Sequence, residues 1–130
     1  MNTKRLILVL SIMIITLSST AQGGRWLFLG ERLVNDRQDH DIVTVTAARG
    51  DFSAIQIRVK GAAVDFHRVI IVYGNGNRQE VELRNTIGAG RNSRVIDLAG
   101  NERIIKHIEF WYDARTIKGR KALVRVFGRS

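Results

Sequence analysis

Cysteine and proline are both absent from the 130 residues of this chain. Without cysteine there are no disulfide bonds, thiol nucleophiles or thiolate metal sites, so packing alone must hold the fold together. A lipoprotein is excluded as well, because its lipid needs a cysteine at the cleavage point. Long apolar runs are also scarce. The longest, residues 6–17, falls short of the roughly 20 residues with which a helix crosses a bilayer.

The first 21 residues have the three-part pattern of a secretory signal peptide. A basic start at Lys4 and Arg5 is followed by the apolar run, and small residues precede Gln22. We therefore expect a signal peptide at residues 1–21, cleaved before Gln22. An uncleaved anchor is the weaker alternative. The mature chain, residues 22–130, is then a single domain in the periplasm or secreted, with no transmembrane span.

Acidic residues are few relative to basic ones. The chain has 21 Lys and Arg against 12 Asp and Glu, a formal net charge of +9. Residues 78–130 carry 12 basic and 6 acidic side chains, whereas residues 22–77 carry 7 and 6. The excess favours an anionic partner, such as an acidic polysaccharide, a phosphate-bearing envelope polymer or a lipid head group. A surface that is basic only for solubility is the alternative.

A helical period of 3.6 residues is also missing after residue 21. Apolar, β-branched and aromatic residues instead alternate with polar ones, and glycines separate the runs. The predicted strands lie near 25–34, 41–48, 54–60, 64–73, 78–84, 94–98, 104–113 and 122–128. About eight such strands indicate an all-β fold, an antiparallel β-sandwich or jelly roll, with a closed β-barrel as the alternative. Asn75-Gly76 predicts a tight hairpin between two of them.

The run at 104–113 suggests a binding surface. If its core-facing residues are Ile108, Phe110 and Tyr112, then His107 and Trp111 face the other way. A tryptophan beside hydrogen-bonding groups is suited to stacking on a sugar ring or to a partner interface. The alternatives are the reverse parity, with Trp111 in the core, and a loop that covers Trp111.

Two predicted loops concentrate the cations of the second half. The candidate ligand-binding cations are Arg91, Arg94, Arg115, Lys118, Arg120 and Lys121. If the loops meet at one end of the sandwich, they form an anion-binding rim. Solvated turns are the alternative. Nucleic acid is disfavoured as a partner, because these stretches lack the interleaved aromatic residues on which bases stack.

Catalytic and metal-binding motifs are lacking. The histidines, His40, His67 and His107, form no paired metal motif, and we expect no cofactor. Asp36, Asp39 and Asp41 are weak candidates for a hard cation, and a solvated acidic loop is the simpler explanation of them.

Eight short motifs spread over residues 22–130 resemble a recurrent family of small exported bacterial proteins without an assigned activity. They are WLFLG at 26–30, DHDI at 39–42, GDF at 50–52 with IQI at 55–57, YGNG at 73–76, RVIDL at 94–98, IEFWY at 108–112 and VRVFG at 124–128. The resemblance implies a compact β-domain of unknown function and names no catalytic residue.

The sequence therefore predicts an exported binding or structural module, with an anionic envelope component as its ligand. The alternative is a small periplasmic hydrolase of glycans or phosphoesters. Its carboxylates would come from Asp36, Asp39, Asp41 or Asp97, with a histidine as acid or base. An enzyme would need these groups to converge in one cleft.

Overall fold

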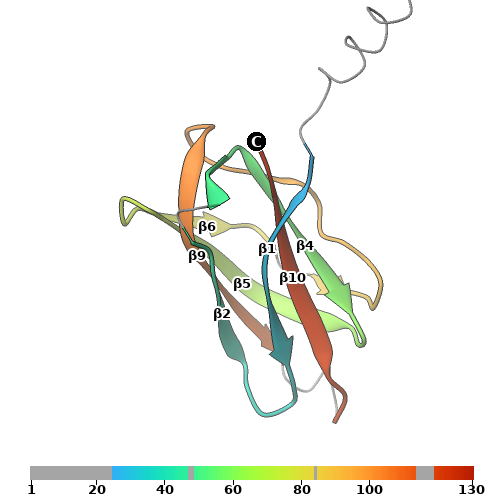
Figure 1. Cartoon of the computed structure of the whole chain (residues 1–130). Coiled ribbons are helices and arrows are strands. Elements are labelled where there is room, and N and C mark those ends of the chain that lie inside the picture. Colours follow the sequence, from blue (N-terminus) through green and yellow to red (C-terminus); the bar gives the residue numbers. More distant parts are fainter. Residues whose placement is uncertain (1–24, 47–48, 84, 114–118) are drawn as a thin grey trace, which may run out of the picture.

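The chain folds into two antiparallel β-sheets packed face to face (Figure 1). A computed structural model describes residues 25–46, 49–83, 85–113 and 119–130. The strands are β1 (Leu27–Val34), β2 (His40–Thr44), β3 (Asp51–Phe52), β4 (Ala54–Lys60), β5 (Val64–Tyr73), β6 (Arg78–Val81), β7 (Thr86–Ile87), β8 (Ile96–Asp97), β9 (Arg103–Asp113) and β10 (Ala122–Arg129). The predicted sandwich is confirmed. The alternative of a closed barrel is wrong, because the described strands form two separate sheets.

One sheet has the strand order β1-β10-β4-β8, and the other follows β2-β9-β5-β6. The short strands β3 and β7 add to β9 and β5 of the second sheet. The sequence pattern misses these two strands, because two residues are too few for an alternation to be seen. The predicted signal segment lies outside the described residues. Among the residues that are described, no helix is long and apolar enough to cross a membrane.

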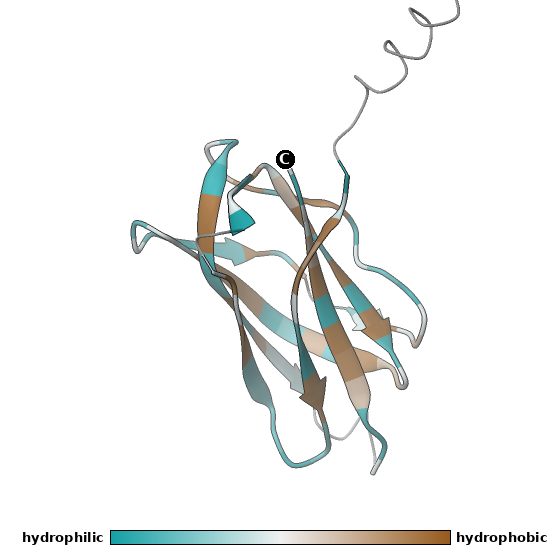
Figure 2. Cartoon of the chain, in the orientation of Figure 1, coloured by the Kyte–Doolittle hydropathy of each residue, from teal (hydrophilic) through white to brown (hydrophobic). Residues whose placement is uncertain are grey.

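Apolar residues alternate with polar ones along the strands (Figure 2). The buried apolar side chains form one core between the two sheets. Ile108, Phe110 and Tyr112 of β9 are buried, as are Val124 and Val126 of β10. This is the predicted parity of both strands. Because the core-facing positions of β9 are fixed, the intervening positions, including His107 and Trp111, lie on the outer face of the second sheet.

The predicted hairpin joins β5 to β6. Tyr73 N–H donates to the Asn77 carbonyl at 2.9 Å, and Gly76 has a φ of +90°. Glycine adopts that value without the clash that a Cβ would cause. β6 is shorter than predicted because Leu83 N–H donates to the Val81 carbonyl at 2.9 Å, which turns the chain out of the sheet.

Candidate functional site

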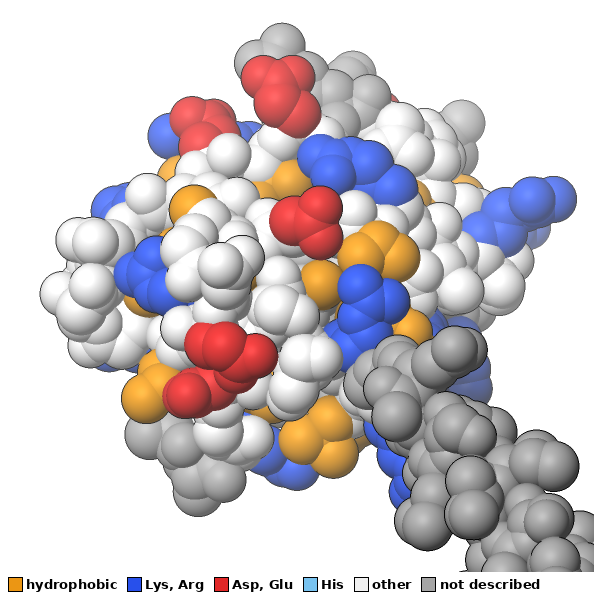
Figure 3. Space-filling view, turned by 90° about the horizontal axis from the view of Figure 1, so that it is seen from above, with side chains coloured by type: hydrophobic (Ala, Val, Ile, Leu, Met, Phe, Trp, Pro, Cys, Tyr) orange, Lys and Arg blue, Asp and Glu red, His pale blue; other side chains and the backbone are white. Residues whose placement is uncertain are grey.

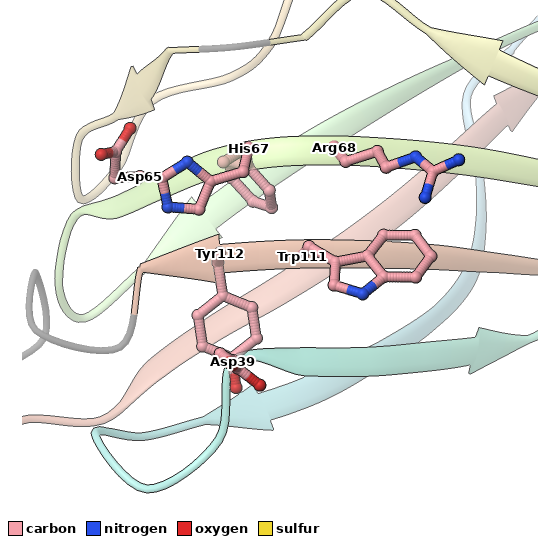
Figure 4. Close-up of a pocket in the computed structure, with 7 residues that line it drawn as sticks. Asp39, Asp65, His67, Arg68, Trp111 and Tyr112 are labelled. Atoms are coloured by element: carbon pink, nitrogen blue, oxygen red, sulfur yellow. The ribbon is translucent and has the colours of Figure 1, made fainter.

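The outer face of the second sheet contains a pocket where β5 and β9 lie side by side (Figure 4). Its volume is about 570 Å³. The lining residues come from β5, β9 and the loop before β2, and are Asp39, Asp65, Phe66, His67, Arg68, Trp111 and Tyr112. The pocket therefore combines an indole with carboxylates, an imidazole and a guanidinium, the mixture of apolar surface and polar groups that small-molecule sites use.

A β-bulge in β5 builds one wall of this pocket. Phe66 pairs with Tyr112 and Arg68 pairs with Trp111, so His67 is an extra residue without a partner in the register. Consecutive strand residues normally point to opposite faces. The bulge breaks that rule, and both His67 and Arg68 are exposed. Bulges often aim side chains into functional sites in this way.

Trp111 is held between side chains from both neighbouring strands. The imidazole of His40, on β2, stacks on the indole with ring centroids 4.4 Å apart and an interplanar angle of 15°. The guanidinium of Arg68, on β5, lies 5.1 Å from the indole centroid. Arg68 also forms an ion pair with Glu80 of β6 at 2.8 Å. These contacts fix the orientation of the indole, which remains half-buried at the pocket wall.

Glu109 contacts three basic side chains elsewhere on this outer face. His107 Nε2 lies 2.9 Å from its carboxylate, His40 Nε2 lies 3.5 Å away and Arg78 lies 3.7 Å away. The hydrogen bond with His107 lowers the pKa of Glu109, and the charge of Arg78 acts in the same direction. His107 therefore shares a face with Trp111 as predicted, but it contacts Glu109 and does not line the pocket.

Three side chains at one end of the pocket could hold a metal ion. Asp65, His67 and Asp113 each offer a ligand atom, and these atoms lie within 4.8 Å of one another. Asp65 also accepts a hydrogen bond from the Thr86 hydroxyl at 3.3 Å. Within the described part of the chain this is the one group of three His, Asp or Glu side chains with that spacing.

The acidic residues singled out from the sequence are separated. Asp36 lines a groove of about 490 Å³ at one end of the sandwich, and Asp39 lines the Trp111 pocket. Asp41 is buried, accepting hydrogen bonds from Tyr112 Oη at 3.1 Å and from Arg32 at 3.3 Å. Asp97 lies on β8 in the other sheet. The four carboxylates predicted for a hydrolase therefore do not converge, because strand parity turns Asp41 inward and Asp97 belongs to the opposite layer.

The two basic loops approach the same end of β4 from different sides. Gly90 N–H donates to the Val59 carbonyl at 2.8 Å, whereas Lys121 borders Gly61. Arg94 donates to the Glu82 carbonyl at 2.9 Å, so part of its hydrogen-bonding capacity is used within the chain.

The remaining predicted cations differ in how they are placed. Arg91 is exposed, and Arg120 and Lys121 line the groove that also contains Asp36. Arg115 and Lys118 lie outside the described residues. Figure 3 looks at the opposite end of the sandwich, where the chain terminates, and basic and acidic side chains are interspersed there. The anion-binding rim stays a prediction.

Sequence reasoning identified Trp111 but missed its partners in the pocket. Asp65, His67 and Arg68 belong to β5, in which the other residues are apolar and buried. The signal that could have revealed them is the adjacent pair His67-Arg68 inside an otherwise apolar run, since two successive polar residues in a buried strand indicate a bulge.

Comparison with solved structures finds a protein of similar fold. AlgX of Pseudomonas aeruginosa, solved for its structural and functional characterization, superposes with a TM-score of 0.53 at 15% sequence identity. The match covers 82% of this chain and 27% of AlgX. At this identity the similarity shows a shared fold alone.

A mutant of CBM29-2, from a study of ligand recognition by family 29 carbohydrate-binding modules, matches at 15% identity, covering 84% of this chain and 82% of that one. Its TM-score of 0.41 is too low to support an argument about function. No curated protein sequence matches the chain. Residues 6–128 match a family described as a domain of unknown function, DUF2541. The resemblance to a family of unknown function is thereby confirmed, and the chain belongs to the DUF2541 family.

Proposed function

We propose that this chain is an exported glycan-binding module whose ligand occupies the Trp111 pocket. The observation that carries the proposal is the half-buried indole in the same pocket as Asp39, Asp65, His67 and Arg68. A sugar ring presents C–H groups on its faces and hydroxyl groups around its rim. The exposed part of the half-buried indole offers an apolar contact for the C–H groups, while carboxylates accept hydrogen bonds from hydroxyls and a guanidinium donates them.

The charge of the pocket favours a neutral sugar over an acidic one. Two carboxylates, Asp39 and Asp65, and one guanidinium, Arg68, line the space. Arg68 is itself paired with Glu80 at 2.8 Å. An acidic sugar would meet net negative charge here, whereas hydroxyl groups would find acceptors already in place.

The stacking around Trp111 supports binding by a preorganised site. His40 and Arg68 hold the indole from the two neighbouring strands, so little side-chain freedom is lost when a ligand contacts it. We therefore assign a segment of an oligosaccharide to this site.

Isothermal titration calorimetry tests this function. The purified protein is titrated with neutral hexose and N-acetylhexosamine oligosaccharides, and with their uronic acid counterparts. We expect saturable binding of at least one neutral oligosaccharide. Trp111→Ala should weaken it by about tenfold or more, since a central aromatic anchor is typically worth about 2 kcal/mol.

Lys106→Gln provides a matched control for Arg68→Gln, because Lys106 is exposed on β9 but does not line the pocket. Arg68→Gln should weaken binding and Lys106→Gln should not. If no neutral oligosaccharide binds, or if Trp111→Ala binds as tightly as the unmodified protein, the assignment of this pocket is wrong.

A further inference from the structure

The outer face of the other sheet has a different chemistry, in which arginines lie on aromatic rings. Arg58 of β4 lies 3.9 Å from the centroid of Phe127, and Arg125 lies 5.3 Å from the same ring. Arg125 is also 4.8 Å from the centroid of Phe28, whose ring meets Phe127 edge-on at 5.6 Å. The strands β1, β10 and β4 therefore present aromatic rings that support flat guanidinium groups.

Another arginine lies on an aromatic ring near the end of β10. Arg129 lies 4.9 Å from the centroid of Trp26. Arg125 and Arg129 are four residues apart on the same face, about 13 Å at the usual strand rise. Arg58 and Arg125 are direct partners across neighbouring strands, about 5 Å apart. We call Arg58, Arg125 and Arg129 the arginine row.

The arginine row is only partly neutralised. Glu31 accepts from Arg125 at 3.2 Å. Arg58 Nε donates instead to the neutral Gln56 amide at 3.2 Å. In the described part of the chain, neither Arg58 nor Arg129 has a carboxylate within salt-bridge distance.

Like charges directly opposite each other on neighbouring strands repel, and Arg58 and Arg125 are such a pair. The register adds Lys60 to the same face, and the acidic side chains on it are Glu31 and Asp97. This outer face of the sheet thus carries four cations and two carboxylates. An anion that bridges Arg58 and Arg125 would relieve their repulsion and use the bidentate geometry of both groups.

From these contacts we infer that the arginine row binds an acidic polysaccharide, through carboxylates repeated along the polymer. The row is extended along β10 and so matches a chain rather than a single small anion. Nucleic acid fits less well, because Phe127 is only 9% exposed and leaves little ring surface on which a base could stack. This site is independent of the Trp111 pocket, which lies on the opposite sheet.

The two tryptophans of the chain make the two surfaces separable in one experiment. Trp26 reports on the arginine row and Trp111 on the pocket, and each gives one indole N–H signal in a proton–nitrogen correlation spectrum. The unmodified protein is titrated with polygalacturonate at low and at physiological salt. We expect the Trp26 signal and the amides of β4 and β10 to shift, and the affinity to fall as salt rises.

Two double variants of equal charge change identify the residues. Arg58→Gln with Arg129→Gln should weaken polygalacturonate binding about tenfold or more. Arg91→Gln with Arg120→Gln removes the same charge from the two basic loops and should change the affinity less than twofold. Unfolding curves show whether each variant folds, and the amide shifts of the unmodified protein locate the site independently.

The inference is overturned if polygalacturonate shifts amides of the basic loops while leaving β4 and β10 unchanged. It is also overturned if the loop variant loses affinity and the arginine-row variant keeps it. Polyphosphate and a single-stranded oligonucleotide are titrated in parallel. Tighter binding of either at the same charge concentration would contradict the assignment to a carboxylate polymer.

Discussion

Removing the hydroxyl group of Tyr112 should measure how much its buried hydrogen bond to Asp41 contributes to the stability of the sandwich. Tyr112 Oη donates to Asp41 at 3.1 Å, and Asp41 also accepts from Arg32 at 3.3 Å. These residues belong to β9, β2 and β1, so the contact links the two sheets. Burial and the neighbouring Asp41 carboxylate raise the pKa of Tyr112, which keeps the phenol protonated as a donor.

Tyr112→Phe deletes this donor and changes little else. A hydrogen bond to a charged group contributes about 1.5–3 kcal/mol to stability. Because Arg32 still holds Asp41 in the variant, we expect the lower end, about 1.5 kcal/mol. For a domain of this size the melting temperature should then fall by about 6–12 °C.

Asp41→Ala should cost more than Tyr112→Phe, about 2–3 kcal/mol, because it leaves the buried phenol without its acceptor. The double variant should be less destabilised than the sum of the two by about 1 kcal/mol. Urea unfolding monitored by circular dichroism supplies all three values. Glu31→Gln breaks an exposed pair on β1 and, as a control, should stay within about 0.5 kcal/mol. A Tyr112→Phe loss below about 0.3 kcal/mol would refute the proposed role of this contact.

Three further predictions concern acid stability, core packing and export. The pKa of Glu109 is lowered in the folded protein from its ordinary value of 4.5, so its stabilising contribution is present above pH 4.5 and is lost as the pH falls through the lower, folded pKa. The melting temperature of Glu109→Gln should therefore fall less between pH 6 and pH 3 than that of the unmodified protein. An equal fall for the two proteins would contradict this. Gly128→Ala should lower the free energy of unfolding in urea by about 1–3 kcal/mol, because the new Cβ would lie 2.7 Å from Phe52. Unchanged stability would show that the neighbouring side chains shift to make room for it. Mass spectrometry of the exported protein should find a chain that begins at Gln22, and an uncleaved chain would refute the signal peptide.

Much of the fold could be predicted from the sequence, because burial on one face imposes a period of two on each strand. The parity of β9 follows from Ile108, Phe110 and Tyr112 alone, and that parity is enough to place Trp111 on the outer face of the sheet. The turn at Gly76 was similarly predictable, since it depends on a local backbone preference.

The candidate sites could be predicted less well, because they depend on which strands become neighbours. His40 and Arg68 are far apart in the sequence, and they reach Trp111 only because β2 and β5 flank β9. The arginine row has the same origin. Arg58 and Arg125 stand opposite each other through the pairing of β4 with β10, which no local pattern specifies. The distribution of charge along the chain instead favours the loops, where the cations are close in sequence.

The most direct test of glycan binding follows the two indole N–H signals of the unmodified protein during titration with the neutral oligosaccharide that binds in calorimetry. We expect the Trp111 signal to shift and to saturate with the affinity that calorimetry gives. The Trp26 signal should remain in place, because Trp26 lies beside Arg129 on the other sheet. A titration that saturates in calorimetry without moving the Trp111 signal, or that moves only the Trp26 signal, would contradict the assignment of the pocket as the glycan site.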